Sequence, residues 1–410
     1  MVLNFLWIAF FLIAFVVALI KLCLGDVVVF KTIVDGIFET AKVGVDISLG
    51  LIGIMALFLG FMNIGERAGA INVLSRIVGP FFNKLFPGVP RNHPAMGHMM
   101  MNFSANLLQL DNAATPFGLK AMQSLQELNP DKETASDAQI MFMVLHASGL
   151  SIIPVSVIAQ RVIVGSKNAT DIFIPCVICT FVATMVAMVI AAFKQKFTGR
   201  QWVAISIFGF IGAAILASFA VFLRHLSNEN ATIFSNVLST GLIMLLFVTF
   251  IVGGMYKKIA VYDAFIDGAK QGFDVAVKII PYLVGILVAI SVLRNSGVFE
   301  YIMDGARWFF AKLGVNTDFV PALPTALMRP FSGAASRGMM IDAMKTYGPD
   351  SFVGHLSCMF QGSSETTFYV VALYFGSVGI KRTRYAIPVS LLADLAGVIT
   401  AIIVAYNWPW

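Results

Sequence analysis

Two short polar stretches interrupt apolar segments of this sequence, and both contain groups that could bind a solute or an ion. Residues 359–376 read MFQGSSETTFYVVALYFG, and residues 146–154 read HASGLSIIP. A carboxylate such as Glu365 costs several kcal/mol at membrane depth unless it is paired or hydrated. We therefore predict that Glu365 faces a cavity or a cation; the alternative is a structural ion pair with Arg329 or Arg337. The neutral ligands expected around it are Gln361, Ser363, Ser364, Thr366, Ser148 and Ser151.

Two further stretches, residues 94–128 and 320–344, mix apolar residues with polar ones that suit a solute. Asp111 and Asn112 lie at the presumed tip of the first, where they bind a solute or cation, or form an ordinary turn or helix cap. Arg337 in the second suits a carboxylate or phosphate, or holds the segment to its neighbours. The remaining candidate ligands in these stretches are Asn106, Thr115 and Ser336.

The candidates for carrying a coupling ion are Glu365, Asp111, His146 and Asp394. His146 is either a proton relay or a satisfied helix–helix contact. Asp394 lies inside the last apolar segment, where it is either a coupling residue or the partner of a basic residue. The C-x-x-C at residues 176–179 has no His or Cys partner at metal-site spacing, so we expect packing cysteines and no metal site.

The composition is that of a polytopic membrane protein. Of 410 residues, 58% are hydrophobic and 12% are charged, whereas a soluble domain carries roughly a quarter charged residues. The net charge of +6 is small, so we expect a lipid bilayer and no nucleic acid as partner. No nucleotide-binding loop, H-E-x-x-H motif or G-x-S-x-G elbow occurs in the sequence, and we expect neither an enzyme nor a cofactor.

A helix needs about 20 apolar residues to cross a bilayer. The segments that qualify are residues 3–24, 47–64, 138–164, 171–193, 202–223, 236–256, 275–293, 352–375 and 385–406. Basic clusters follow the fourth, sixth and eighth of these, and the positive-inside rule makes that side cytoplasmic. We expect a bacterial inner-membrane protein with its N-terminus in the cytoplasm and its C-terminus outside.

Four segments do not fit simple spans. Residues 94–128 and 320–344 are long enough to enter the membrane and return, so we predict re-entrant hairpins, whose irregular backbone requires protein or water around it. Residues 29–45 and 259–277 are amphipathic and are predicted to lie in the membrane interface. The alternative for these two is that each is the extended end of the next span.

The sequence contains an internal repeat, in which matching motifs of the two copies are separated by one constant number of residues. The matching pairs are A-K-x-G-x-D at 41 and 269, Gly69 and Gly297, F-F-x-K-L at 81 and 309, and F-S at 103 and 331. The spans that open the two copies are five spans apart, so the copies are predicted to be inverted in the membrane. A slightly shorter offset pairs Ser151 with Glu365, so both copies carry a polar break at the same place. Inverted repeats with broken helices are typical of secondary transporters.

The residues at these breaks resemble a known family. Residues 1–197 resemble spore maturation protein A through GHMMMNFSANLLQLDNAATPFGLKAMQSLQELNP. Residues 230–410 resemble spore maturation protein B through PTALMRPFSGAASRGMMIDAM and GHLSCMFQGSSETTFYVVALYFGSVGIKRTRYA. Residues 198–229 are then a linking transmembrane helix. The resemblance implies two nucleoside-recognition, or gate, domains and a plan similar to the concentrative nucleoside transporters, which work as elevators in a trimer.

Together these features predict an all-α polytopic membrane protein with two inverted repeats. The expected function is H+- or Na+-coupled transport of a small polar or zwitterionic solute, such as an amino acid or nucleoside, at the repeat interface. A homo-oligomer, dimer or trimer, is expected. The alternative is a ligand-sensing receptor or a channel of the same fold without coupled transport.

Overall fold

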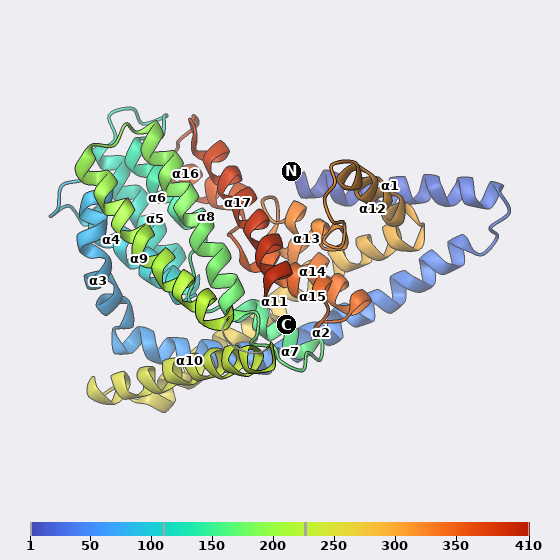
Figure 1. The fold of residues 1–410 in the computed structure, drawn as a ribbon, viewed down its shortest axis with the longest axis horizontal. Helices are drawn as coiled ribbons and strands as arrows, with labels where there is room; N and C mark the ends of the chain where they lie inside the picture. Colours follow the sequence, from blue (N-terminus) through green and yellow to red (C-terminus); the bar gives the residue numbers. More distant parts are fainter. Residues whose placement is uncertain (1, 110, 225–227, 409) are drawn as a thin grey trace.

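The structure, a computed structural model, describes residues 2–109, 111–224, 228–408 and 410 (Figure 1), and within these ranges it contains helices and no β-strand. In chain order the elements are α1 (Val2–Cys23), α2 (Val29–Ala68), α3 (Ala70–Leu85), α4 (Pro94–Leu107), α5 (Asp111–Leu128), α6 (Asp137–Ala147), α7 (Val155–Ile163), α8 (Phe173–Lys194), α9 (Gly199–Arg224), α10 (Asn228–Tyr256), α11 (Val261–Asn295), α12 (Val298–Lys312), η1 (Val320–Ala322), α13 (Leu323–Met328), α14 (Gly333–Tyr347), α15 (Phe352–Gly362), α16 (Thr367–Ser377) and α17 (Ala386–Asn407). The predicted all-helical class is confirmed.

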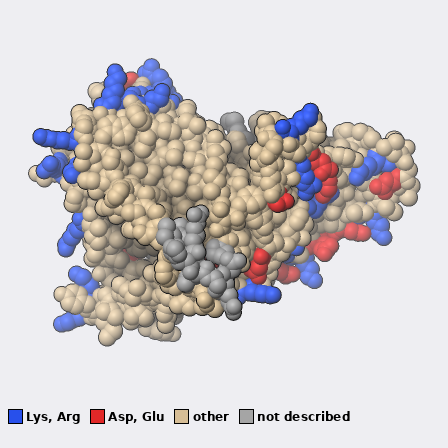
Figure 2. Space-filling model, in the orientation of Figure 1, with Lys and Arg blue, Asp and Glu red and all other residues tan. Residues whose placement is uncertain are grey.

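Four helices of the described residues are long and apolar enough to cross a membrane: α2, α8, residues 199–218 of α9, and α17. A fifth span results if residues 283–295 and 298–312, which meet at a bend of 76°, form one crossing. Shorter apolar helices lie within α1 and α10. Figure 2 shows a broad face without charged side chains between rims where Lys, Arg, Asp and Glu gather. These features are those of a membrane protein, whose apolar surface contacts lipid.

Two long helices, α2 and α11, pack along each other in opposite directions (Figure 1). Glycines allow their backbones to approach, as small residues do in membrane helix pairs. A Cβ on Gly272 would lie 2.6 Å from the backbone of Ala56, and one on Gly44 would lie 3.0 Å from the side chain of Val284. The two helices form a closely packed pair, and α1, α10, α7 and α14 are among the elements that pack on it.

The boundaries of these long helices differ from the prediction of separate interfacial segments. Residues 29–45 continue without interruption into α2, and residues 261–277 continue into α11. The prediction of separate interfacial helices is therefore wrong, and the stated alternative holds: each amphipathic segment extends the next span. A glycine with positive φ separates each long helix from the next helix: Gly69, with φ of 87°, follows α2 directly, and Gly297, with φ of 85°, immediately precedes α12. These are repeat-matched positions, and glycine adopts this backbone without strain.

Each predicted hairpin segment contains two α-helices, and the second also begins with a short 3-10 helix. Residues 94–128 form α4 and α5, which pack against each other, and residues 320–344 form η1, α13 and most of α14. Two predicted spans are divided: residues 138–164 form α6 and α7, and residues 352–375 form α15 and most of α16. The unbroken helices α8 and α17 pack side by side next to these divided segments (Figure 1).

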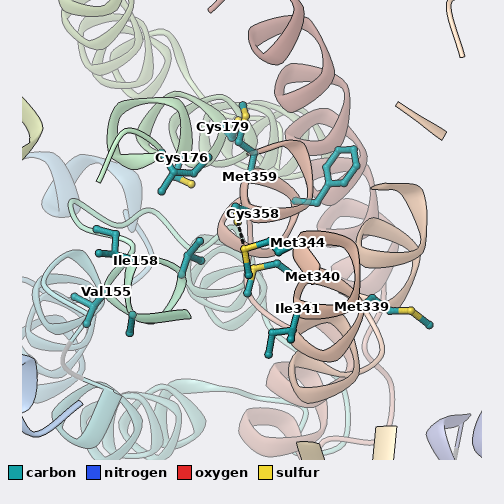
Figure 3. Close-up of a cluster of buried hydrophobic side chains, with 14 of the residues drawn as sticks. Val155, Ile158, Cys176, Cys179, Met339, Met340, Ile341, Met344, Cys358 and Met359 are labelled. Atoms are coloured by element: carbon teal, nitrogen blue, oxygen red, sulfur yellow. Dashed lines mark hydrogen bonds between the residues drawn. The ribbon is translucent and has the colours of Figure 1, made fainter. Parts of the chain in front are cut away.

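The core beside the divided helices is rich in sulfur (Figure 3). Cys176 and Cys179 of α8 and Cys358 of α15 are buried, and the Cys358 thiol lies 3.4 Å from the Met344 sulfur. Methionine and cysteine fill irregular gaps well because they are soft and polarizable. The cysteines lie in the packed core, the position expected of packing residues.

Candidate functional site

The two divided segments are built alike, and each is positioned by a serine at its start. Ser136 caps α6 and Ser351 caps α15, each through a side-chain oxygen that accepts a backbone N–H, which stabilises a helix start by about 1 kcal/mol. The helices then stop at Ala147 and Gly362, and helical structure resumes at Val155 and Thr367. The predicted polar breaks are therefore confirmed as interruptions of the helical backbone.

The two breaks touch each other. The backbone N–H of Glu365 donates to the Ala147 carbonyl at 2.9 Å. Gly149 has a φ of 64°, and a Cβ on it would lie 2.9 Å from the Glu365 nitrogen and 3.0 Å from the Ser364 carbonyl carbon. Glycine is needed at position 149 because any side chain would separate the breaks. Segments more than 200 residues apart in sequence thus meet at the place where both lack helical hydrogen bonds.

A cavity of about 170 Å³ lies at this meeting point. Leu51 and Met55 of α2 supply apolar wall, and Gly149, Pro154, Val157 and Gly362 supply backbone or apolar surface. The polar side chains of the wall are Gln109, Ser156, Gln160, Arg329, Arg337, Gln361, Ser364 and Glu365. Four of these, Arg337, Gln361, Ser364 and Glu365, were predicted from the sequence as solute ligands.

Charges of both signs face the cavity. Arg329, whose side chain is 11% exposed, lies 3.7 Å from the Glu365 carboxylate, which is 40% exposed. The Arg329 guanidinium also donates to the Ser364 carbonyl at 2.7 Å. The structural ion pair considered for Glu365 is therefore present, and it forms part of the cavity wall. Arg337 adds a second guanidinium to the wall.

Three glutamines bring amide groups to the same wall. The side-chain oxygens of Gln160 and Gln361 are buried and accept no hydrogen bond from the described residues. The Gln109 oxygen accepts from the backbone N–H of Val155 at 3.1 Å. Buried amide oxygens normally have a partner, so Gln160 and Gln361 are suited to accept hydrogen bonds from a bound molecule. Sequence reasoning missed Gln109 and Gln160, which lie in otherwise apolar stretches.

The other predicted hydroxyl ligands do not line the cavity. Ser148 contacts Thr184 of α8 at 2.9 Å, Ser363 donates to the Phe360 carbonyl at 3.0 Å, and Ser336 donates to a carbonyl of α13 at 2.8 Å. The Ser148 contact joins the first break to α8, the Ser336 bond joins α14 to α13, and the Ser363 bond is local to the end of α15. Binding of solute by these residues stays a prediction. Three more predicted ligands are also absent from the wall: Ser151, Thr115 and Thr366.

His146 joins the first hairpin segment to the second divided segment. Its Nδ1 lies 2.7 Å from the Asn106 amide nitrogen and 3.2 Å from the Asn102 amide oxygen. Its Nε2 lies 3.3 Å from the hydroxyl of Tyr374, which is fully buried on α16. These hydrogen bonds agree with the second of the two roles given for His146, a hydrogen-bonded contact between helices. A proton-relay role stays a prediction.

Asp394, a further coupling candidate, does not line the cavity. Asp394 of α17 is buried next to the second break, where the Thr367 hydroxyl donates to it at 2.7 Å. In the first hairpin segment α4 ends at Leu107 and α5 begins at Asp111, so the predicted tip residues open α5, and the re-entrant path stays a prediction. The side chains of Asp111 and Asn112 lie outside the described part of the chain.

A fully buried guanidinium, Arg161 of α7, was missed by the sequence reasoning. It donates to the Pro349 carbonyl at 2.7 Å and forms ion pairs with Asp171 at 2.9 Å and Asp350 at 3.1 Å. His355 also lies 3.0 Å from Asp171. The charge within predicted span 138–164 was the signal that could have found it. We name this cluster the buried junction because it joins the loop after α7 to the loop before α15.

The acidic and imidazole groups of the buried junction also have a spacing that suits a metal ion, since ligand atoms of Asp171, Asp350 and His355 lie within 4.8 Å of one another. The Arg161 guanidinium reaches all three groups. It supplies the positive charge that a metal would otherwise bring. The geometry is that of a hydrogen-bonded ion-pair network.

A second, exposed junction joins the loop before α6 to the loop before α17. Backbone N–H groups of Lys381 and Arg382 donate to the Glu133 carbonyl at 2.9 Å. Ion pairs there join Lys381 to Glu133, Arg382 to Asp131 and Arg384 to Asp137. The basic cluster used to predict orientation is therefore matched by acids from the other half of the chain.

Comparison with known proteins agrees with the residue-level resemblance. Residues 48–167 and 276–381 match the family model Gate, described as nucleoside recognition. The chain is 46% identical to Spore maturation protein B of Bacillus subtilis (strain 168) over 169 residues, which are 41% of this chain and 93% of that protein. It is 36% identical to Spore maturation protein A of the same organism over 200 residues, which are 48% of this chain and 99% of that protein. No solved structure matches the chain.

Proposed function

Because this chain belongs to the Gate family of nucleoside-recognition proteins, we propose that it is a secondary active transporter of a small polar or zwitterionic solute, coupled to H+ or Na+. The observation that carries the proposal is the cavity where the breaks of two apolar segments meet. Secondary transporters place solute and ion sites at such discontinuous helices, where freed backbone groups and helix ends provide ligands. The proposal places the protein in the bacterial inner membrane and includes no enzymatic step.

The proposed architecture is a pair of inverted repeats. Gly44 of α2 faces Val284 of α11, while Gly272 of α11 faces Ala56 of α2. In the sequence repeat Gly44 corresponds to Gly272, and Ala56 corresponds to Val284. Contacts exchanged between equivalent positions of two oppositely directed helices support a two-fold relation with its axis in the membrane plane.

The proposed mechanism is elevator-like. The moving core would comprise the two hairpin segments, here taken as re-entrant, and the divided segments α6–α7 and α15–α16. The frame would comprise α1, α9, α10 and the long helices α2 and α11. A homo-oligomer would hold the frames still in the membrane. Cysteines placed at the two ends of one hairpin segment test the re-entrant arrangement, because a true crossing would label them from opposite sides.

The chemistry of the wall favours a small zwitterion. Arg337 and Arg329 suit an anionic group, Glu365 suits a cationic one, and the oxygens of Gln160 and Gln361 suit N–H or O–H donors. The volume of about 170 Å³ is below the roughly 300–1,000 Å³ of sites that enclose drug-sized ligands. An amino-acid-sized solute therefore fits better than a nucleoside in this conformation.

Flux into proteoliposomes tests the proposal. Purified protein is reconstituted, a pooled set of amino acids and nucleosides is added, and uptake is measured with inward H+ or Na+ gradients and without them. Accumulation that depends on a gradient is the expected result. Gradient-independent conduction would indicate a channel, and binding without flux would indicate a receptor; either outcome overturns coupled transport.

Glu365→Gln tests the site itself, since among the described residues Glu365 is the carboxylate that lines the cavity. We expect gradient-driven uptake to fall at least tenfold, with folding preserved because the amide keeps the shape of the side chain. The matched control is Glu133→Gln, which removes an exposed carboxylate from the exposed junction. A Glu365→Gln protein with lower thermal stability and normal uptake would make Glu365 a structural partner of Arg329 alone.

A further inference from the structure

Asp394 is a buried carboxylate of α17 that lies next to the second break and does not line the cavity. The residue is 5% exposed. The Thr367 hydroxyl donates to its Oδ2 at 2.7 Å, whereas its Oδ1 is buried without a hydrogen-bond partner among the described residues. An ionised carboxylate in this situation is costly unless a positive charge accompanies it.

No direct ion pair among the described residues provides that partner. Arg329 and Glu365 are the charged groups that act on Asp394 through space. Arg329 is directed elsewhere, because it donates to the Ser364 carbonyl and lies 3.7 Å from Glu365. The ion pairs found among the described residues leave Asp394 out.

Neutral oxygens gather around the same carboxylate. The hydroxyls of Thr367 and Ser364 both interact with it. The Ser363 carbonyl oxygen lies 3.4 Å from the point where a Cβ on Gly397 would be, one turn along α17 from Asp394. Ser363, Ser364 and Thr367 belong to the second break or its edge, whereas Gly397 and Asp394 belong to α17. Carboxylate, hydroxyl and backbone carbonyl oxygens are the ligands that hard cations prefer.

The donor set matches a monovalent cation better than a divalent one. Sites for divalent cations such as Ca²⁺ commonly use several carboxylates, and here Asp394 is one carboxylate among neutral oxygens. One negative charge with neutral oxygens at the C-terminal end of a helix suits Na+, as in other discontinuous helices.

From these contacts we propose that Asp394, with Thr367, Ser364 and the Ser363 carbonyl, forms a Na+ site behind the second break. The ion would fix the shape of the break from one side while Ser364 and Glu365 present its other side to the cavity. Binding of Na+ does not depend on transport, but its meaning as the coupling ion rests on the proposed function.

Thermal unfolding in detergent tests the site without any transport measurement. The purified full chain is titrated with NaCl, with choline chloride keeping the ionic strength constant, and parallel titrations use KCl. Since a ligand that binds the folded state stabilises it by mass action, about ten times the Kd of Na+ should raise Tm by roughly 1–2 °C. Asp394→Asn should abolish this rise, and Thr367→Val should weaken the apparent Na+ affinity about tenfold.

Two controls separate this site from other carboxylates. Asp304→Asn removes an exposed carboxylate of α12 and should leave the rise in Tm unchanged. Glu365→Gln should also retain it, and loss of the rise in Glu365→Gln with retention in Asp394→Asn would place the cation in the cavity and overturn the proposal. If Asp394→Asn does not fold, Thr367→Val decides. Equal effects of Na+, K+ and choline on the wild type would likewise overturn it.

The outcomes for ion and solute can be told apart. Solute uptake driven by a proton gradient, with no specific effect of Na+ on Tm, would remove the Na+ site and leave the proposed transporter intact. A specific Na+ effect that Asp394→Asn abolishes, without flux of any pooled solute, would support the site and contradict the transporter.

Discussion

Replacing Arg161 by methionine removes the central charge of the buried junction while keeping an unbranched side chain of moderate length. Arg161 is 0% exposed, and its partners Asp171 and Asp350 have side chains that are 16% and 32% exposed. After the substitution both carboxylates would face each other and the Pro349 carbonyl would lose its donor. The loop after α7 and the loop before α15 would then repel where they now bind.

The size of this effect follows from burial. Removing one partner of a buried ion pair costs about 3–5 kcal/mol, and the partial exposure of Asp350 places the expected loss near the lower end, at about 3 kcal/mol. The matched control is Lys381→Met at the exposed junction, where the side chains of Lys381 and Glu133 are 72% and 54% exposed. An exposed pair contributes about 0–1 kcal/mol, and the backbone bonds of that junction remain.

Thermal unfolding in one detergent, followed by tryptophan fluorescence, measures both variants. A loss of 1 kcal/mol lowers Tm by roughly 1 °C in a chain of this size, so Arg161→Met should lower Tm by about 3–4 °C and Lys381→Met by about 1 °C or less. Adding Asp350→Asn to Arg161→Met should recover part of the loss, because one unpaired charge disappears. Similar shifts in Tm for the two single variants would refute the reasoning from burial.

Two other predictions concern close packing and pH. A Cβ on Gly272 would lie 2.6 Å from the backbone of Ala56, whereas one on Gly285 would meet nothing within 4 Å; Gly272→Ala should therefore cost about 1–3 kcal/mol and Gly285→Ala nothing, and equal Tm values would contradict the close approach of α2 and α11. Burial by itself would raise the pKa of Asp350, but hydrogen bonds such as that from Ser166 prevail and lower the pKa below its ordinary value of 3.8. A depressed folded-state pKa gives stability above about pH 4 that is lost as pH falls through that pKa, so the destabilisation caused by Asp350→Asn at about pH 7 should shrink at about pH 3, and an unchanged difference would contradict it.

The breaks could be predicted from the sequence because their cause is local. Glycine, proline and hydroxyl-bearing residues inside an apolar run weaken a helix wherever that run folds, and the repeat placed Ser151 opposite Glu365. Knowing that the breaks correspond in two copies was enough to expect that they meet. Four of the cavity's polar side chains followed from that expectation.

What the sequence could not supply were contacts fixed by three-dimensional packing. Gln160 and Arg161 are neighbours in one short helix, yet one faces the cavity and the other faces the buried junction. Their surroundings depend on where α15 and its preceding loop lie. Likewise, an amphipathic pattern such as residues 29–45 is the same for an interfacial helix and for half of a long helix, so the continuity of α2 had to come from the structure.

The contacts also bear on the proposed elevator motion, which requires the two halves of the core to move as one body past the frame. The Glu365–Ala147 hydrogen bond and both junctions tie the halves together. The α2 side of the cavity wall consists of Leu51 and Met55, and apolar side chains can exchange neighbours without leaving a hydrogen bond unmade. On the other side of the frame, the ion pair between Arg294 of α11 and Asp342 of α14 joins frame to core. Sliding of the core past the frame would have to break or exchange that ion pair. We therefore expect the resistance to this proposed motion at the second hairpin segment and not at the cavity.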